Sequence, residues 1–365
     1  MIYLVGLVLI VLVGLLGSLY LSNAFSKFRA IRSLSGGRKW LGRLIGFGLL
    51  AGGFALFTWL LSVLDAAIIL LHLLFAFLLY GLVFRIFRRK TGEQPKRNWQ
   101  GWLALLTAGV YLLIGYFQCM HVWKTEYALS TEKAVGELRI ALLADSHLGT
   151  TFDGEGFAAY LEEILQEKPD LIAISGDFVD DDTRRRDMQL ACEALGKAET
   201  PYGVWFAYGN HDKGYFNSRD FSAEELARTM EENGIHILED ETAELGGICL
   251  VGRRDASSGP RKELSALLEG VGTDRYVIVL DHEPTDFEKE AATDADLVLC
   301  GHTHGGQMIP LGLVGLWFGN NDREYGYETR NGTEFIVTSG ISDWAVHFKT
   351  GTRSEYVMIT VTGSR

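Results

Sequence analysis

Cysteine is scarce in this chain, and the four cysteines are far apart. Cys119, Cys192, Cys249 and Cys300 are the only ones, and no two of them lie within 50 residues of each other. Zinc knuckles and disulfide frameworks need cysteines at short, paired spacings. The sequence therefore indicates neither. It also contains no internal repeat and no low-complexity tract.

Acidic residues are nearly absent from the first third of the chain and abundant afterwards. Residues 1–124 carry 13 Lys and Arg against Asp65 and Glu93, a net charge of +11, and the remaining residues carry −23. A domain this acidic lacks the basic surface that binds phosphate backbones, so we expect no nucleic-acid partner. The change near residue 124 predicts a first region of residues 1–123, a polar linker at 124–137 and a soluble domain at 138–365.

Long apolar runs predict that the first region crosses a membrane. Residues 2–22 and 99–120 carry no charge, and residues 44–84 carry only Asp65 near their middle. A helix of about 20 apolar residues spans a hydrocarbon core of roughly 30 Å. We therefore expect an all-α region of four transmembrane helices, with Asp65 at the turn of a central hairpin. A cleavable signal peptide is the rival interpretation of the first run, but a basic n-region and a small-residue cleavage site are not evident.

The basic residues of the first region predict its orientation. Six Lys and Arg lie at 27–43 and six at 85–97, in the two loops between predicted helices. Basic loops near membrane-spanning helices stay on the cytoplasmic side. The sequence thus predicts a multi-pass protein of the cell membrane, in contact with the lipid bilayer, whose soluble domain is extracytoplasmic. A contact of these loops with anionic lipids is a second interpretation of the same residues.

After residue 137, short apolar runs alternate with amphipathic stretches, which is typical of βα units around a sheet. We expect helices at 157–166, at 183–197 and from Ser222, where Ser222 and Glu225 form a capping box. The expected strands are 138–144, 171–174, 203–207, 248–251, 276–280, 297–300, 334–338 and 356–361.

Metal-binding residue types follow five of these predicted strands. In chain order they are Asp145 and His147, Asp177 and Asp180, Asn210 to Asp212, His282, and finally His302 and His304. Open α/β sheets place their sites at the carboxyl ends of the strands. Residues two apart in an extended chain point the same way, so His302 and His304 have the spacing of a ligand pair. Helix capping would explain any one of these stretches, but a metal site explains all five together.

These motifs form an ordered series. Asp-x-His, Gly-Asp-x-x-Asp, Gly-Asn-His-Asp, a single His and Gly-His-x-His resemble the signature of the calcineurin-like metallophosphoesterases, and the series runs from Asp145 to His304. Residues 305–307, 339–341 and 351–355 look like the bacterial branch of small lipid-directed and membrane-associated phosphoesterases. The resemblance covers roughly residues 137–362. It implies an α/β fold, a four-layer αββα sandwich of two mixed sheets flanked by helices, here preceded by the transmembrane region.

The resemblance also implies two metal ions and a role for each motif residue. Asp145, His147 and His304 would bind the first ion, Asn210, His282 and His302 the second, and Asp177 both. Imidazole and carboxylate ligands suit manganese, iron or zinc better than magnesium alone. The protein would be a hydrolase acting on phosphoric ester bonds, in which metal-activated water attacks phosphorus. Its expected substrates are phosphate mono- or diesters, with lipid-linked and envelope compounds as candidates.

Further residues have predicted roles around these ligands. His211 would donate a proton to the leaving oxygen as general acid, oriented by Asp212. Asp180 would orient a metal ligand from behind. Arg253 and Arg254 follow the apolar run at 248–251 and are candidates for binding a substrate phosphate; an exposed basic pair is the alternative.

Two other functions stay open at this point. A non-catalytic metal-binding interaction module, tethered to the membrane, would keep the sandwich, but such proteins usually lose the acid or a bridging ligand, and Asp177, Asn210 and His211 are all present. A sensor or transporter would need a polar path through the membrane helices, for which only Asp65 and His72 are candidates.

Overall fold

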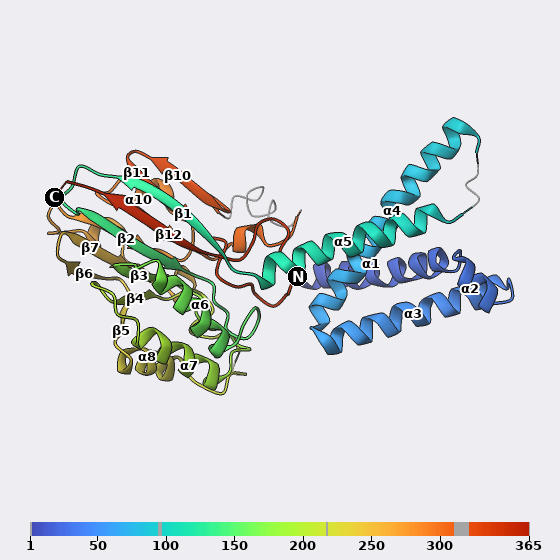
Figure 1. Ribbon diagram of the computed structural model, residues 1–365, viewed down its shortest axis with the longest axis horizontal. Coiled ribbons are helices and arrows are strands. Elements are labelled where there is room, and N and C mark those ends of the chain that lie inside the picture. The colour runs from blue at the N-terminus through green and yellow to red at the C-terminus, as the bar shows by residue number, and fades with distance from the viewer. Residues whose placement is uncertain (1, 94–96, 217, 310–320, 365) are drawn as a thin grey trace. The chain divides into compact units, whose positions relative to one another are not determined.

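The computed structural model describes residues 2–93, 97–216, 218–309 and 321–364, with side chains from residue 13 onward. The chain divides into two compact units, Met1–Gly115 and Tyr116–Arg365 (Figure 1). Lys96, one of the basic residues used to predict the orientation, lies outside the described residues.

The first unit is helical. Its elements are α1 (Ile2–Phe25), α2 (Arg29–Leu34), α3 (Lys39–Leu60), α4 (Val63–Thr91) and most of α5 (Trp99–Met120). In the described part of the chain, α3, α4 and α5 are long and apolar enough to cross a membrane, and Val13–Phe25 of α1 is a shorter apolar stretch. The first predicted membrane helix thus lies within α1.

The two polar groups of the predicted membrane helices make local contacts. Ser62 caps α4 by accepting a hydrogen bond from the Asp65 backbone nitrogen at 3.0 Å, so Asp65 lies in the first turn of α4 rather than at the hairpin turn itself. His72 Nδ1 lies 2.8 Å from the Ile68 carbonyl oxygen, one turn earlier in the same helix. These two hydrogen bonds lie within α4, and the His72 ring also stacks on that of Tyr111 in α5, with centroids 5.3 Å apart. None of these contacts favours a polar path.

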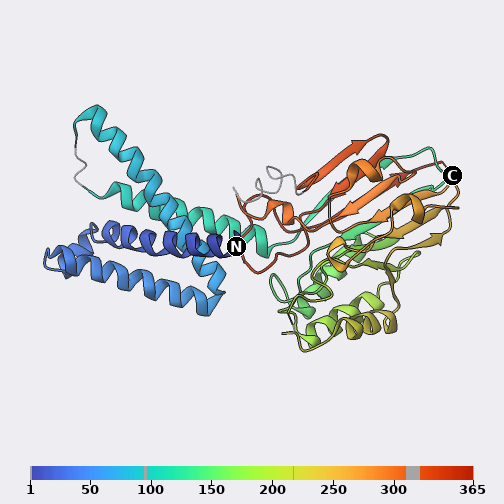
Figure 2. The ribbon, with the colours of Figure 1, turned by 180° about the vertical axis from the view of Figure 1, so that it is seen from behind.

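The second unit contains two six-stranded sheets, seen from opposite sides in Figures 1 and 2. The first sheet has the order β1 (Trp123–Ser130), β12 (Glu355–Thr362), β2 (Glu137–Leu143), β3 (Leu171–Ser175), β4 (Val204–Ala207) and β5 (Ile235–Leu238). The second has the order β10 (Gly326–Arg330), β11 (Thr333–Val337), β9 (Leu297–Cys300), β8 (Tyr276–Leu280), β7 (Ile248–Gly252) and β6 (Glu241–Leu245). Both sheets mix parallel and antiparallel pairs.

Three apolar cores define four layers. Side chains of β2, β3, β8 and β9, among others, form the core between the two sheets. The outer face of the first sheet packs on α6 (Gly154–Gln166), α7 (Arg185–Gly196) and α8 (Ala223–Glu232). The outer face of the second packs on the short helices α9 (Leu264–Leu267) and α10 (Phe287–Glu290). Strands covered on both faces read as continuous apolar runs, which is why β3, β8 and β9 are evident in the sequence.

The predicted linker at 124–137 is wrong for its first half. Residues 123–130 form β1, which pairs in parallel with β12 from Trp123↔Glu355 to Ser130↔Thr362. This edge strand has only partly buried side chains on its inner face, except for Leu129. Its apolar pattern is therefore weak, and its pairing partner lies more than 200 residues away in the sequence. The edge strands β5, β6 and β10 were not predicted either; they are short, and each contains partly buried or exposed side chains.

The sheets bring the predicted motifs to one edge. Strands β2, β3 and β4 run parallel in the first sheet, and β8 and β9 run parallel in the second. The Ser175 hydroxyl at the end of β3 donates to the Leu299 carbonyl oxygen of β9 at 2.8 Å, which joins the sheets there. The Ser342 backbone nitrogen, after β11, donates to the Asp145 carbonyl oxygen at 3.2 Å. Loops that are distant in sequence therefore meet beside these strand ends.

Candidate metal centre

The backbone of the strand-end loops is left-handed at five of the seven predicted ligands. The φ angles are 54° at Asp145, 34° at His147, 53° at Asp177, 72° at His302 and 49° at His304. Such a conformation costs a residue with a Cβ on the order of 1–3 kcal/mol, and it persists where the surrounding structure enforces it. Five residues with this costly backbone conformation lie at one edge of the sheets, which indicates a functional site there.

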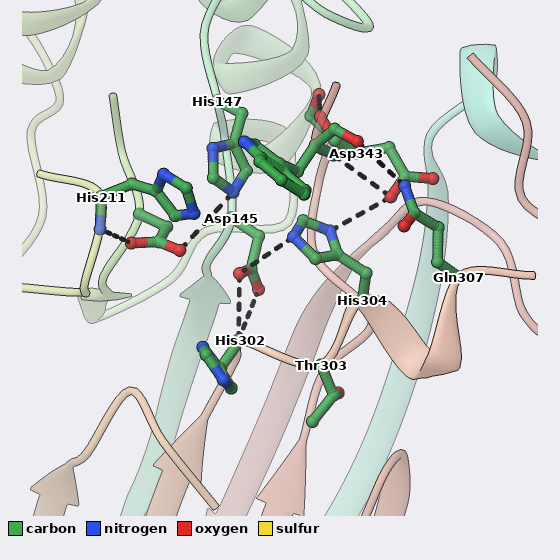
Figure 3. A network of polar contacts seen from close by, with 12 residues as sticks. Asp145, His147, His211, His302, Thr303, His304, Gln307 and Asp343 are labelled. Atoms are coloured by element: carbon green, nitrogen blue, oxygen red, sulfur yellow. Dashed lines mark hydrogen bonds and ion pairs between the residues drawn. The ribbon is translucent and has the colours of Figure 1, made fainter. Parts of the chain in front are cut away.

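The first cluster consists of Asp145, His147 and His304, whose ligand atoms all lie within 4.8 Å of one another. All three residues are buried. Nε2 of His304 lies 3.7 Å from Oδ1 of Asp145, whose carboxylate also accepts the His302 backbone N–H at 2.9 Å (Figure 3). Nε2 of His147 is buried without a hydrogen-bond partner among the described residues. A buried, unpaired imidazole nitrogen of this kind is a ready ligand atom.

The second cluster consists of Asp177, His282 and His302, again with ligand atoms within 4.8 Å of one another. Asn210 joins it, because Oδ1 of Asn210 lies 3.1 Å from Nε2 of His282 and 2.9 Å from Nδ1 of His302. The Tyr215 hydroxyl lies 2.8 Å from Nδ2 of Asn210, on the other side of the amide. The Asn210 amide therefore presents its oxygen to the cluster.

Asp177 lies between the two clusters. Its Oδ2 is 3.1 Å from Nε2 of His282 in the second cluster and 3.6 Å from Nε2 of His147 in the first. Burial acts to raise the pKa of Asp177, but the imidazoles of His282 and His147 outweigh it, so the pKa is lowered. Burial and the neighbouring His282 lower the pKa of His302 to about 4, which keeps that imidazole neutral at pH 7.

Two glycines of the motifs allow the carboxylates to approach the backbone. A Cβ on Gly301 would lie 2.5 Å from Oδ2 of Asp145, and one on Gly209 would overlap Oδ1 of Asp177. A side chain at either position would collide with a carboxylate, so glycine is needed at both.

Groups behind the histidines hold their rings in place. Nδ1 of His147 lies 3.2 Å from Oδ2 of Asp180. Nδ1 of His304 lies 3.2 Å from Oδ1 of Asp343, as Figure 3 shows. Nδ1 of His282 lies 2.8 Å from the Ser175 carbonyl oxygen. In each case an oxygen lies within 3.2 Å of the outer nitrogen and Nε2 faces a cluster, the arrangement that orients metal-binding histidines. Asp180 occupies the position that its predicted orienting role requires.

Asp343 is a site residue that the sequence did not indicate. It is fully buried and follows β11, another strand that ends beside the site, but five residues separate it from the end of that strand. Lys349, also fully buried, lies behind it. Its Nζ donates to the Ser339 carbonyl oxygen at 2.6 Å and lies 3.8 Å from Oδ2 of Asp343. Its ammonium therefore supports the loop that carries Asp343.

The predicted contact between Asp212 and His211 is wrong. The Asp212 carboxylate instead accepts backbone N–H groups of Asp177 at 2.9 Å, Gly209 at 2.7 Å and Val179 at 3.1 Å. Burial, together with the charge of Asp177, raises the pKa of Asp212 to about 7. Asp212 thus joins the loops after β3 and β4. Its carboxylate bonds to three backbone N–H groups of these loops and not to the adjacent imidazole of His211.

His211 lies at the rim of both clusters. Its backbone nitrogen donates to Oδ1 of Asp177 at 2.8 Å (Figure 3). Its ring centroid is 5.0 Å from that of His147, 4.9 Å from Tyr215 and 5.3 Å from Trp344. The ring is therefore held between the metal-ligand cluster and two aromatic side chains, neither of which the sequence indicated.

The predicted role of Arg253 and Arg254 in binding phosphate is also wrong. Arg253 is only 3% exposed, and its Nη1 lies 2.8 Å from Asp281 and 3.0 Å from Glu290. Nε of Arg254 lies 2.8 Å from Glu239. Both guanidinium groups are paired with carboxylates within the domain, so neither is the free basic group that a substrate phosphate needs.

The fold and the site together define a class of protein, an αββα sandwich whose strand ends carry two carboxylate–imidazole clusters. A family model for calcineurin-like phosphoesterases matches residues 138–306. Residues 138–306 are thus similar to calcineurin-like phosphoesterases, which agrees with the resemblance of the motifs.

Individual proteins are also similar to this chain. An uncharacterized metallophosphoesterase of Campylobacter jejuni is 28% identical over 273 residues, covering 72% of this chain and 70% of that protein. A transmembrane protein with metallophosphoesterase domain from Danio rerio is 29% identical over 322 residues, covering 82% and 72%. A solved dimetal phosphatase from Danio rerio is similar with a TM-score of 0.37 and 14% identity, covering 56% of this chain and 87% of that one.

Asp343 generates a prediction about metal binding. We expect Asp343→Asn to weaken binding of Mn²⁺ about 10- to 100-fold, because the amide no longer supplies the charge that orients His304. Competition with a fluorescent chelator measures the affinity. Asp274→Asn, in an exposed turn of the same unit, is the matched control and should bind like the wild type. Equal affinities for all three proteins would contradict the role of Asp343.

Proposed function

We propose that this protein hydrolyses phosphate mono- or diesters with two divalent metal ions, and that Asp177 is a ligand to both. The observation that carries the proposal is the position of Oδ2 of Asp177, 3.1 Å from His282 in one cluster and 3.6 Å from His147 in the other. A carboxylate shared in this way brings two ligand sets within the few ångströms that two-metal hydrolysis needs.

The donor set fits such ions. Asp145, His147 and His304 would hold one, and Asn210, His282 and His302 the other, with manganese, iron or zinc as the metals that suit this mixture. Nε2 of His147, which is buried and makes no hydrogen bond within the described residues, supports the assignment. When bound, the two ions would supply an activated water and neutralise charge on the phosphoryl oxygens.

His211 is the proposed general acid. Its backbone is fixed by Asp177, and its ring is partly exposed at the rim, whereas His147 and His282 are fully buried. A protonated ring there would donate a proton to the leaving oxygen, so that the leaving group departs as a neutral alcohol and not as an alkoxide. The retention of this histidine beside a complete donor set favours hydrolysis over a non-catalytic binding module.

The test is hydrolysis by the full chain purified in detergent. We expect turnover of p-nitrophenyl phosphate or its bis-ester with Mn²⁺, and loss of turnover after chelation. His211→Ala should lower kcat by about 10²- to 10⁴-fold with unchanged metal content. The loss should be larger for phenyl phosphate than for p-nitrophenyl phosphate, because the poorer leaving group needs the proton more.

His236→Ala, on the edge strand β5, is the matched histidine control and should keep wild-type activity. A metal-loaded wild type that hydrolyses no phosphoester with manganese, iron or zinc would refute the proposed function. A fully active His211→Ala variant would refute only the acid role.

We further propose that the protein is a multi-pass membrane protein with its catalytic domain on the extracytoplasmic side. Three long apolar helices and the transmembrane relative from Danio rerio indicate membrane association. The basic residues at 27–43 and 85–97 support the orientation. Substrates would then be envelope or lipid-linked phosphates.

Topology has a direct measurement. Alkaline phosphatase, which is active only outside the cytoplasm, should be active when fused after Lys124, and green fluorescent protein at the same position should stay dark after Sec export. A fusion set with the opposite pattern would place the catalytic domain in the cytoplasm.

A further inference from the structure

Large apolar side chains are exposed on the catalytic unit mainly in one region. Trp344, Tyr215, Phe216 and Ile309 are 45%, 53%, 74% and 56% exposed. The first two lie against His211, with ring centroids 5.3 and 4.9 Å from it. Ile309 belongs to the loop that follows His304, and its backbone nitrogen bonds to Thr350 at 3.1 Å. We call these four residues the apolar rim.

The remaining large apolar side chains exposed on the described part of this unit are few. Tyr116 and Phe117 belong to the last turns of α5, and Tyr327 is on β10. Apart from Tyr327, exposed apolar side chains therefore occur at two places, the rim of the metal centre and the end of an apolar helix.

These two places are joined by one loop, residues 342–354. The ring of Phe348 lies 6.2 Å from that of Tyr116, and the Val346 carbonyl oxygen lies 3.8 Å from Sγ of Cys119. The Ser354 backbone nitrogen donates to the Gln118 carbonyl oxygen at 2.9 Å. Trp344 precedes Val346 by two residues, a span of at most about 7 Å of extended chain. Trp344 is thus held close to the end of α5.

The end of α5 marks the boundary of a membrane if α5 crosses one, as its 22 residues and apolar composition allow. Tryptophan and tyrosine are the residues that favour the bilayer interface, where the ring is partly apolar and partly hydrated. The apolar rim has this composition, and the short loop connects Trp344 to the end of α5.

We propose that Trp344 contacts the apolar part of a phosphoester carried by a bilayer lipid, while the phosphate reaches the two ligand clusters. The inference rests on the proposed hydrolysis and names its substrate class. In the reaction, a water oxygen bonds to phosphorus, the ester P–O bond breaks, and the leaving oxygen takes a proton. Trp344 is a specificity-determining residue, because it holds the organic part of the substrate and not the reacting atoms.

The test uses the full chain in phosphatidylcholine nanodiscs, which leave both membrane faces accessible, with Mn²⁺. Two matched substrate pairs differ only in chain length: hexadecyl and methyl 4-nitrophenyl phosphate as diesters, and hexadecyl and methyl phosphate as monoesters. We expect the wild type to prefer the hexadecyl member of the pair that it hydrolyses. Trp344→Ala should reduce the ratio of the two kcat/KM values about tenfold, the loss expected for one aromatic contact.

Two variants separate this effect from a general defect. Trp344→Phe should restore most of the preference, since it keeps an aromatic ring. Tyr327→Ala removes the exposed aromatic side chain that lies away from the rim and should keep the wild-type ratio.

Each other outcome has a distinct meaning. An unchanged ratio in Trp344→Ala would overturn the lipid contact and leave the proposed function intact. A change in oligomeric state with an unchanged ratio would also overturn it, by assigning the rim to a second copy of the chain. A wild type that turns over none of the four esters with manganese, iron or zinc would refute the proposed function together with the inference.

Discussion

The shared carboxylate of Asp177 is the contact on which the geometry of this site depends. It lies between an imidazole from the loop after β2 and one from the loop after β8, so it joins the two sheets at their functional edge. Much of the surrounding structure serves this one side chain. Asp212 fixes its backbone nitrogen, the absence of a side chain on Gly209 makes room for Oδ1, and the backbone N–H of His211 bonds to the same oxygen.

The predicted ligand residues could be picked out from the sequence because of where they stand in the chain. Each follows an apolar run that is buried on both faces, and such runs are visible without knowing their neighbours. Because these strands are parallel, the loops that follow them all lie at the same edge of the sheet. His302 and His304 show the limit of this argument. Their spacing indicates a ligand pair, but their division between two clusters depends on Asp145 and Asn210, which come from other strands.

Residues whose roles depend on distant partners were missed or misjudged. Strand β1 has little apolar character and exists through its pairing with β12. Arg253 looked free in the sequence, because Asp281 and Glu290 approach it only when β7, β8 and α10 are folded together. Asp343 lies in an irregular loop whose position is set by Lys349 and by the last turns of α5. Local patterns cannot show contacts of this kind.

The central claim is that the two clusters form one dinuclear centre around Asp177. Metal analysis of the purified full chain, beside an Asp177→Asn variant of nearly the same shape, tests it most directly. The account predicts about two divalent ions per wild-type chain and weaker binding of both ions in the variant, because one carboxylate serves both. A wild-type chain that binds one ion or none, or a variant that still holds both ions with wild-type affinity, would contradict it.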